Sequence, residues 1–251
     1  MVIGPQAALA QVAVGANGDP SFSLPLKTAP SVGGMVPKLA LIYTGGPNRE
    51  LGQGWALGGV SKIERCAATK AVDGVPGSVQ YKNSDKLCLD GQRLIQVDSA
   101  GVPLAFPQSG DAAAVASGSY REYRPERDSL TRVRAYGGSG SYGPAYFMVW
   151  SADGRLTEYG DSPGAATDAK ARHLASGVGV SWAVSRAADS SGNFIQYLYS
   201  NYWGYSFTAA YEWTLDEVRY TGTAGQAPSN KLVLTGEGVR SCKCKVNRCS
   251  P

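Results

Sequence analysis

Residues 24–66 read LPLKTAPSVGGMVPKLALIYTGGPNRELGQGWALGGVSKIERC, and the rest of the chain is organised around this stretch. Pro37 opens an extended run in which Leu39, Leu41 and Tyr43 fall on one face. That alternation is typical of a β-strand, because successive side chains of a strand point to opposite faces. The stretch offers strands and turns but no recognisable reactive group. We therefore expect it to act through its shape.

A glycine-rich turn and a tryptophan follow this first strand. The run GGPN at 45–48 predicts a chain reversal, because turns favour Gly, Pro and Asn. Trp55 and Leu57 then share one face of a second strand, where nearby glycines permit close backbone contact. If the Trp55 ring is fully buried, Trp55→Ala should cost about 3–5 kcal/mol. The signature positions of the two strands are Pro37, Leu39, Leu41, Tyr43, Gly52, Gly54, Trp55, Leu57, Gly58 and Gly59.

The composition of the whole chain favours an all-β protein. Its 251 residues include 32 Gly and 14 Pro, about 18% of the chain where average usage is about 12%. Together with 14 Tyr and few long apolar runs, this predicts many short antiparallel strands and hairpins. The one Ala-rich run with charges, at 165–174, predicts a loop or a single helical turn.

Asp-Gly dipeptides between alternating apolar residues mark candidate hairpins. They occur at 73–74, 90–91 and 153–154, and the related run DSSGN spans 189–193. Asp and Gly tolerate the positive φ of a type I′ turn, so each site should reverse the chain between two strands. Further strands are expected within FIQYLYSNYW (194–203), YEWTLDEVRYTG (211–222) and KLVLT (231–235).

The net charge of +4 does not indicate an acidic partner, because most of it lies in residues 236–251. A basic stripe on a recognisable nucleic-acid module is missing, so we expect no nucleic-acid partner. The tail cysteines Cys242, Cys244 and Cys249 lack the paired C-x2-C sets and nearby His of a zinc site. No segment approaches the roughly 20 apolar residues of a membrane-spanning helix.

The residue inventory predicts no catalytic site. The single histidine, His173, lies in a polar stretch, and no G-x-S-x-G motif presents a nucleophile to it. Carboxylate pairs at Glu122 and Glu126, and at Asp216 and Glu217, would suit a glycosidase only if a cleft held them. We therefore expect a non-enzyme with no catalytic residue, no cofactor and no bound metal.

The ordered motifs of the chain resemble the opening region of Rhs (YD-repeat) proteins of the SpvB/TcdB type. Such proteins carry M-x-P-x-L-x-L-x-Y and then G-x-G-W-x-L-G-G-x-S-x-I-x-R, which here run from Met35 to Tyr43 and from Gly52 to Arg65. Further matches in the family's order are LCLDGQRL from Leu87, GPAYFMVWSADGRLTEYG from Gly143 and DSSGNFIQYLYSN from Asp189. The resemblance covers nearly all of residues 20–235.

The resemblance implies a β-rich shell and a role without catalysis. In such proteins this region begins a hollow container around a separate toxic C-terminal domain, which holds the activity. We accordingly expect an SpvB/Rhs-like shell region at 21–235, as an open or incomplete sheet or sandwich. A flexible lead would precede it at 1–20, and a non-family tail rich in Cys and basic residues would follow at 236–251. The chain then reads as a truncated member of the family.

The resemblance also implies export and partners. We expect a secreted protein with a cytoplasmic stage before export, although residues 1–20 lack the basic region of a full signal peptide. Its partners would be the remainder of an Rhs or toxin-complex assembly, or a C-terminal toxin domain. A second interpretation is a carbohydrate- or cell-surface-binding β-sandwich module. Glycan binding would then depend on exposed tyrosines such as Tyr142 or Tyr202.

Export has a consequence for Cys66 and Cys88, which lie on or beside expected strands. A disulfide between them would persist in the oxidising environment that an exported protein meets. The bridge would close a loop of about twenty residues, worth roughly 3 kcal/mol in the chain-entropy model. A Cα separation above about 7 Å would exclude it. The alternative is a pair of buried free thiols.

Overall fold

The computed structural model describes residues 11–14, 20–49, 51–104, 110–128, 130–173, 176–201 and 213–234. About 50% of the chain is β-strand and 5% is helix. Every pairing between strands is antiparallel within the described residues. The prediction of an all-β fold built from many short antiparallel strands is confirmed.

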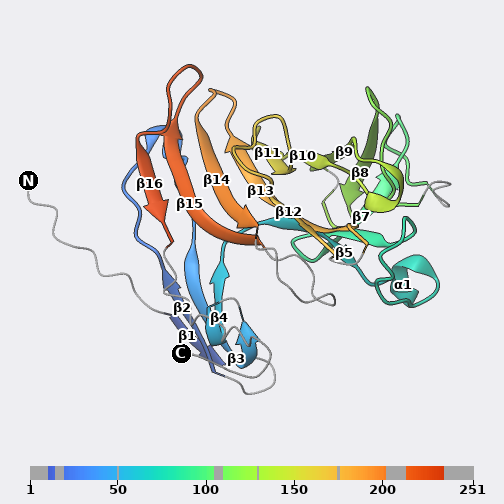
Figure 1. Cartoon of the computed structure of the whole chain (residues 1–251), viewed down its shortest axis with the longest axis horizontal. Helices are drawn as coiled ribbons and strands as arrows, with labels where there is room; N and C mark the ends of the chain where they lie inside the picture. Colours follow the sequence, from blue (N-terminus) through green and yellow to red (C-terminus); the bar gives the residue numbers. More distant parts are fainter. Residues whose placement is uncertain are drawn as a thin grey trace, which may run out of the picture.

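Four strands form the smaller of two sheets. They are β1 (Gln11–Val14), β2 (Pro20–Pro25), β3 (Ala40–Arg49) and β4 (Gly52–Gly58), paired in that order. Figure 1 shows this sheet in blue and cyan, below the larger sheet. One of its faces carries the rows Phe22–Tyr43–Trp55 and Leu24–Leu41–Leu57, since these residues are direct cross-strand partners.

Eight strands of the larger sheet form a closed ring. They are β5 (Lys62–Cys66), β6 (Lys86–Leu89), β7 (Gln92–Val97), β8 (Tyr120–Pro125), β9 (Arg132–Tyr136), β10 (Tyr146–Trp150), β11 (Leu156–Gly160) and β13 (Gly179–Ala188). The first seven pair in sequence order, and β13 closes the ring because it pairs with both β5 and β11. Closure leaves no free sheet edge among these eight strands.

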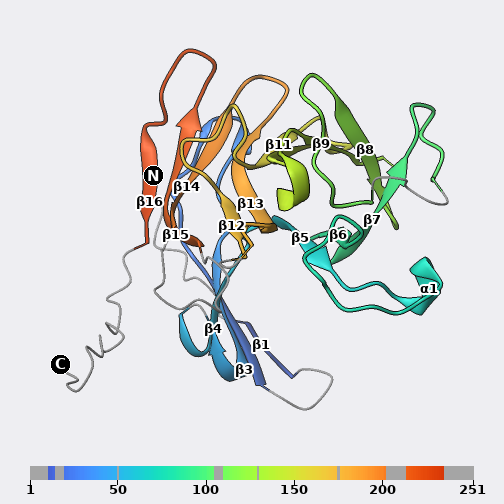
Figure 2. The same cartoon turned by 45° about the vertical axis from the view of Figure 1, so that its right-hand side comes forward.

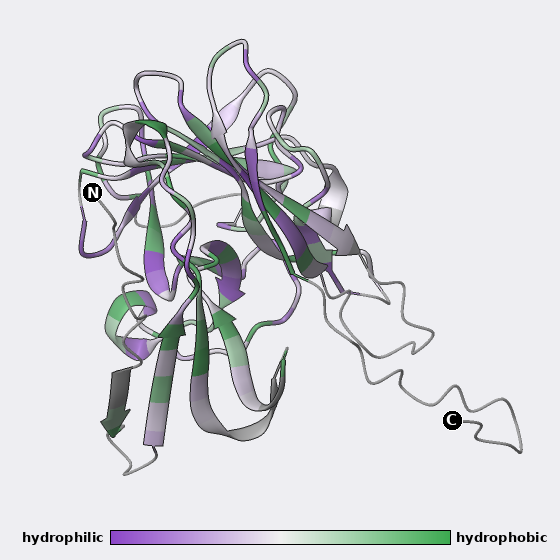
Figure 3. Ribbon diagram, turned by 90° about the vertical axis from the view of Figure 1, so that its left-hand side faces the viewer, coloured by the Kyte–Doolittle hydropathy of each residue, from purple (hydrophilic) through white to green (hydrophobic). Residues whose placement is uncertain are grey.

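The remaining strands extend the larger sheet from β13. β12 (Lys170–Arg172) pairs with β13, and β14 (Phe194–Asn201), β15 (Trp213–Gly222) and β16 (Asn230–Val233) continue as a meander. Figure 2 shows β14, β15 and β16 in orange and red, at the opposite end of the sheet from α1 (Lys70–Asp73). Figure 3 shows hydrophobic and hydrophilic residues interspersed along the strands of both sheets.

Helix is confined to short segments in the described residues. Besides α1, there are 3-10 turns at Val32–Gly34 and Gly140–Tyr142. The run 165–174 contains the strand β12 rather than only a loop or a helical turn, so that prediction is wrong for Lys170–Arg172. Pairing with β13 supplies the backbone hydrogen bonds there, and a long-range partner of this kind leaves no local sequence signal.

Three of the four expected Asp-Gly turns reverse the chain between neighbouring strands. Asp90 (φ 49°) and Gly91 (φ 80°) join β6 to β7, as a type I′ turn requires. The turn around Gly154 joins β10 to β11. The turn that begins at Asp189 joins β13 to β14, and its carboxylate accepts hydrogen bonds from the backbone of Ser191 and Asn193, both at 2.9 Å. These hairpin predictions are confirmed.

Two other turn predictions are wrong. Asp73 and Gly74 end α1, where Gly74 takes the left-handed conformation (φ 76°) that commonly terminates a helix. The run 45–48 does not reverse the chain, because β3 continues to Arg49 and pairs there with Gly52. The pairing register shifts between Tyr43 and Asn48, so the extra residues form an irregularity within a hairpin instead of its tip.

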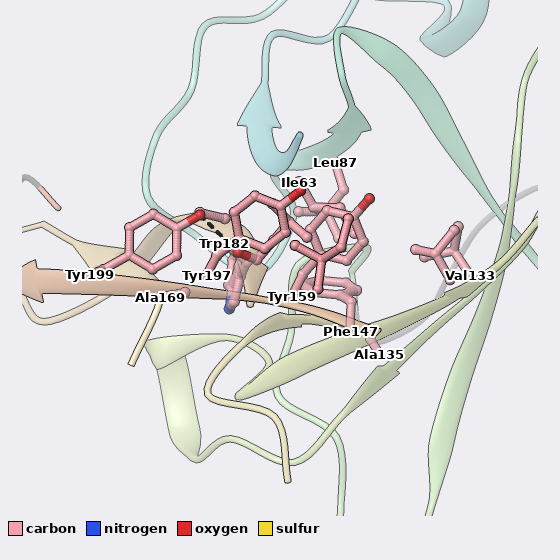
Figure 4. Packing of buried hydrophobic residues seen from close by; sticks show 14 of the residues in the cluster. Ile63, Leu87, Val133, Ala135, Phe147, Tyr159, Ala169, Trp182, Tyr197 and Tyr199 are labelled. Carbon is pink, nitrogen blue, oxygen red and sulfur yellow. Dashed lines mark hydrogen bonds between the residues drawn. The ribbon is translucent and has the colours of Figure 1, made fainter. Parts of the chain in front are cut away.

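The hydrophobic core lies mainly inside the ring and under β13–β15. Trp182 is completely buried, donates from Nε1 to the carbonyl oxygen of Pro144 at 3.0 Å, and meets Phe147 edge to face. Figure 4 shows Trp182 and Phe147 among the buried side chains of this cluster. The sequence predicts apolar side chains on both faces of β14. In the structure one of these faces is buried and the other is half-buried. Its buried residues are Ile195, Tyr197 and Tyr199.

Candidate functional site

The segment before β3 buries alternate residues of the signature stretch. Met35, Pro37 and Leu39 are buried, whereas Lys38 between them is exposed. The Leu39 carbonyl oxygen accepts a hydrogen bond from the Leu26 backbone at 2.8 Å, which holds the two segments side by side. The stretch thus anchors the small sheet to the main core before β3 begins.

Glycines in this stretch allow backbone and side chains to approach closely. A Cβ at Gly59 (φ 89°) would lie 2.0 Å from the Lys38 carbonyl oxygen, and one at Gly58 would lie 2.1 Å from Ile42 Cδ1. At Gly54 (φ 73°) it would lie 2.6 Å from Tyr43 Cε2. The contact at Gly59 meets backbone, so this position admits only glycine, whereas a Cβ at Gly58 or Gly54 would push a neighbouring side chain aside. Gly52 pairs with Arg49 at the end of the hairpin.

Trp55 is only half-buried, so the premise of a fully buried ring is wrong. Its ring centroid lies 5.2 Å from that of Tyr43 and 6.0 Å from that of Phe22. Leu41, Tyr43 and Leu57 are likewise half-buried, although Leu57 packs against the main core. The physical reason is the size of the small sheet, whose four strands enclose no interior of their own. Among the described residues, Trp182 is the fully buried tryptophan.

The two candidate cysteines meet on β5 and β6. Cys66 lies opposite Lys86 and Cys88 lies opposite Glu64, so the two cysteines are diagonal neighbours on adjacent strands. A disulfide joins them, with an S–S distance of 2.10 Å and a Cα separation of 5.9 Å. The separation is within the range that a bridge needs without backbone movement.

Four charged side chains form a compact cluster beside this disulfide. Arg93 Nη2 lies 2.5 Å from Asp73 Oδ1 and 3.7 Å from Asp111 Oδ2. Lys86 Nζ lies 2.9 Å from Asp111 Oδ2 and 3.6 Å from Asp73 Oδ1. Burial lowers the pKa of Arg93, while the carboxylates of Asp73 and Asp111 oppose that shift. The cluster ties α1 to β6, β7 and the segment after Gly110.

Arg65 forms a second buried charge pair, inside the ring. Its Nη1 lies 3.1 Å from Asp85 Oδ2, and its Nε donates to the Gly179 carbonyl oxygen at 2.6 Å. Burial lowers the pKa of Arg65, although the charge of Asp85 opposes the shift. The pair joins β5 to β13 at the seam where the ring closes. Its geometry is that of an internal brace rather than a site open to a ligand.

The carboxylates considered for glycoside hydrolysis are not arranged for it. Burial opposes ionisation of Glu122, but hydrogen bonds from Arg134, Arg132 and Arg124 outweigh burial and lower its pKa. A general acid needs a raised pKa instead. Glu217 also has a lowered pKa, because Arg219 donates to it at 2.6 Å.

His173 is held by local contacts. Its ring stacks on Tyr81 with the centroids 4.4 Å apart, and Nδ1 lies 2.9 Å from Ser176 Oγ. Among the contacts of the described residues, no carboxylate reaches the His173 ring to complete a triad. In the same residues, no group of three or more His, Cys, Asp or Glu side chains could hold a metal ion.

The outer face of β8–β10 carries a ladder of aromatic and arginine side chains. The rings of Tyr136 and Tyr146 stack with centroids 5.0 Å apart, and the Arg134 guanidinium lies 3.9 Å above the Tyr120 ring. Arg134 thus covers one face of the Tyr120 ring, and Tyr136 and Tyr146 cover one face of each other. Tyr142 is 49% exposed but lies elsewhere, after β9. The ladder therefore gives no support to glycan binding.

Several expectations fall outside the described residues. These are the tail at 236–251 with Cys242, Cys244 and Cys249, most of the lead at 1–20, and Tyr202. Within the described part of the chain, no helix is long and apolar enough to cross a membrane.

A family model matches most of the chain. The model for SpvB, described as Salmonella virulence plasmid 65kDa B protein, covers residues 14–214. The chain belongs to the SpvB family. The resemblance drawn from the ordered motifs is thereby confirmed, and the match spans β2–β4 of the small sheet, the whole ring and β14. Among curated proteins, none matches this chain.

Solved structures of toxin components are similar to this SpvB-family chain. TcdB2-TccC3-TEV is 21% identical with a TM-score of 0.65, over 98% of this chain and 12% of that one. The N-terminal domain of effector protein SpvB from Salmonella typhimurium strain LT2 is 23% identical with a TM-score of 0.53, over 80% and 66%. A Photorhabdus luminescens Tc holotoxin pore is 20% identical with a TM-score of 0.57, over 84% and 10%. At these identities the likeness shows the fold alone.

The described chain spans about a tenth of the length of the Tc toxin chains it matches. Sequence reasoning missed the charge cluster and the Arg65–Asp85 pair. The cluster's members lie on separate segments between residues 73 and 111, so no spacing motif marks it. Arg65 alone carried a signal, as the last position of the second family motif.

Proposed function

We propose that this chain is a non-catalytic shell segment of a secreted, toxin-related Rhs protein. It would form part of the container around a separate C-terminal toxin. The observation that carries the proposal is coverage, since 98% of this chain matches only 12% of the TcdB2-TccC3-TEV chain. Its fold is thus the fold of one part of a much larger toxin component.

The chemistry of the described side chains supports a scaffold. Glu122, Asp85 and Asp73 each form an ion pair with an arginine, so these carboxylates are engaged in structural contacts. Tyr123 and Tyr159 are buried, and burial raises the pKa of both hydroxyls above their ordinary value. None of these groups is held ready for proton transfer or nucleophilic attack.

The domain boundaries belong to the same proposal. The shell region spans 21–235, between a lead at 1–20 and a tail at 236–251. The strands from β2 to β16 support the shell region, while β1 and the family match from residue 14 extend into the lead. Its partners would be the remaining shell strands and the toxin domain. Export would bring the chain into an oxidising environment.

Reconstitution tests the proposal. The purified chain is mixed with a separately expressed polypeptide that carries the remaining shell strands and the toxin domain, and complex formation is followed by analytical ultracentrifugation and limited proteolysis. We expect a one-to-one complex in which both chains resist protease, and no turnover by the chain alone in ADP-ribosyl-transfer, glycosidase and protease assays. A chain that stays monomeric, or turnover that one substitution in this chain abolishes, would overturn the proposal.

A further inference from the structure

The Cys66–Cys88 disulfide has an unusual neighbour, the buried guanidinium of Arg93. The Arg93 side chain is 9% exposed, and its Nη1 lies 3.8 Å from Cys66 Sγ. A disulfide sulfur is a weak acceptor, so this contact satisfies the donor poorly. Whether the Arg93 donors are satisfied therefore depends on the other groups around the guanidinium.

The two sides of the Arg93 guanidinium are unequally satisfied. Nη2 faces the carboxylates of Asp73 and Asp111, at 2.5 and 3.7 Å. On the other side, Nε is buried and has no hydrogen-bond partner within the described part of the chain. Nη1 points at Cys66 Sγ. Buried donors left without a full acceptor cost free energy.

Reduction of the disulfide would supply the missing acceptor. A Cys66 thiolate beside Nη1 would be a charged acceptor, which a guanidinium stabilises far better than a disulfide sulfur. Other charges lie close to the same guanidinium: the carboxylates of Asp73, Asp111 and Glu126, and the ammonium of Lys86. The stabilisation that Arg93 gives a Cys66 thiolate is therefore the sum of all these charges. The equilibrium between disulfide and dithiol shifts toward the dithiol whenever the reduced form is stabilised.

Cys88 and Arg93 line the same surface groove of about 410 Å³, together with Val72 and Gln92. Cys88 itself is 7% exposed and Cys66 is half-buried, so exposure does not distinguish the two sulfurs. The contact from Arg93 Nη1 reaches Cys66 Sγ, and this contact marks Cys66 as the leaving group.

We infer that Cys66–Cys88 is a site of thiol–disulfide exchange with dithiol reductants, in which Cys66 leaves as a thiolate held by Arg93. A thiolate of the reductant bonds to Cys88 Sγ, the S–S bond breaks, and its electron pair leaves on Cys66 Sγ. The second thiolate then attacks the mixed disulfide and releases Cys88, so the dithiol is oxidised as the two cysteines are reduced. This inference is independent of the proposed shell function.

Equilibration of the full chain with dithiothreitol redox buffers tests the inference. Free thiols are alkylated and located by peptide mass spectrometry, which separates Cys66 and Cys88 from the tail cysteines. Arg93→Gln should make the bond about tenfold harder to reduce, equivalent to about 30 mV. Arg132→Gln removes a cation that pairs with Glu122 on another part of the ring, and should leave the equilibrium unchanged. Equal shifts in both variants would overturn the inference.

A second measurement holds even if Arg93→Gln fails to fold. In Cys88→Ser, the alkylation rate of Cys66 is followed against pH, and in Cys66→Ser that of Cys88. We expect Cys66 to titrate below the ordinary cysteine value of about 8.5, and Cys88 at or above it. A Cys66 thiol that titrates at or above about 8.5, or a bridge from either residue to a tail cysteine, contradicts the inference.

Discussion

The small sheet β1–β4 and the closed ring differ in where their sequence signals and their buried contacts lie. The small sheet holds seven of the ten signature positions, yet its aromatic residues Phe22, Tyr43 and Trp55 are half-buried. The ring carries family matches of its own on β6, β7, β10 and β11, and it encloses fully buried side chains, among them Trp182 and Phe147. A family motif therefore does not by itself mark where the buried core lies.

The difference follows from what each region needs. The small sheet is joined to the core by close backbone approaches, and such approaches tolerate only glycine, so its sequence is distinctive. The ring needs buried volume, which many apolar residues can supply. We expect substitutions in the ring to cost more free energy of unfolding than equivalent substitutions in the small sheet.

Two tryptophan substitutions give the largest expected contrast. Trp182→Ala should lower the free energy of unfolding by about 3–5 kcal/mol, because it empties a fully buried site. Trp55→Ala should cost less, about 1–3 kcal/mol, since its ring is half-buried. Chemical denaturation of both variants measures the difference, with Trp182→Phe as a smaller loss at the same position. Equal costs at the two positions would break the comparison.

Loss of the disulfide should have the next largest effect. The bridge lies on ring strands β5 and β6, and its removal in the double variant Cys66→Ser, Cys88→Ser should cost roughly 3 kcal/mol. Peptide mapping of the untreated wild-type chain should find residues 66 and 88 linked. Free thiols at both positions in protein from an oxidising compartment would refute the bridge.

Glycine substitutions sharpen the account of the small sheet. Gly59→Ala places a Cβ 2.0 Å from the Lys38 carbonyl oxygen at a positive φ, so it should cost about 2–3 kcal/mol. Gly45→Ala is the matched control, because its φ is also positive (67°) but nothing lies within 4 Å of the added atom. It should cost about 1 kcal/mol. Thermal unfolding of both variants distinguishes close contact from backbone strain alone.

Glu122 on the ring's outer face gives the smallest effect and a pH dependence. Its pKa is lowered in the folded chain from the ordinary value of 4.5, mainly because three arginines outweigh burial. Its stabilising contribution is therefore complete above about pH 4.5 and is lost as pH falls through the folded pKa. Glu122→Gln should cost about 1–2 kcal/mol at pH 7, and the cost should shrink as pH falls below about 4.5. A cost independent of pH would show that the ion pairs contribute nothing.

Local signals in the sequence predicted much of this fold, and long-range contacts account for the rest. The hairpins at Asp90 and Asp153 follow from turn chemistry that two adjacent residues contain. The same dipeptide at Asp73 ends the helix α1 instead. The residues before the dipeptide determine whether it follows a strand or a helix. Closure through β13 joins residues more than a hundred positions apart, so no local pattern reports it.

The candidate site divides in the same way. The signature glycines and the cysteine pair were visible in the sequence because each carries a local or family pattern. The Arg93 cluster was not, since its four residues come from α1, β6, β7 and the segment after Gly110. The sequence suggests a buried Trp55, whereas the structure fully buries Trp182, because residue type alone does not say which tryptophan the ring encloses.

Hydrogen exchange measured by mass spectrometry tests the central contrast most directly. Amides of β5–β11 and β13 should exchange only through global unfolding, because these strands share closed pairing and a buried core. Amides of β2–β4 should exchange faster, through local opening of the small sheet. Uniform protection across both sheets, or faster exchange in the ring than in β2–β4, would contradict the account.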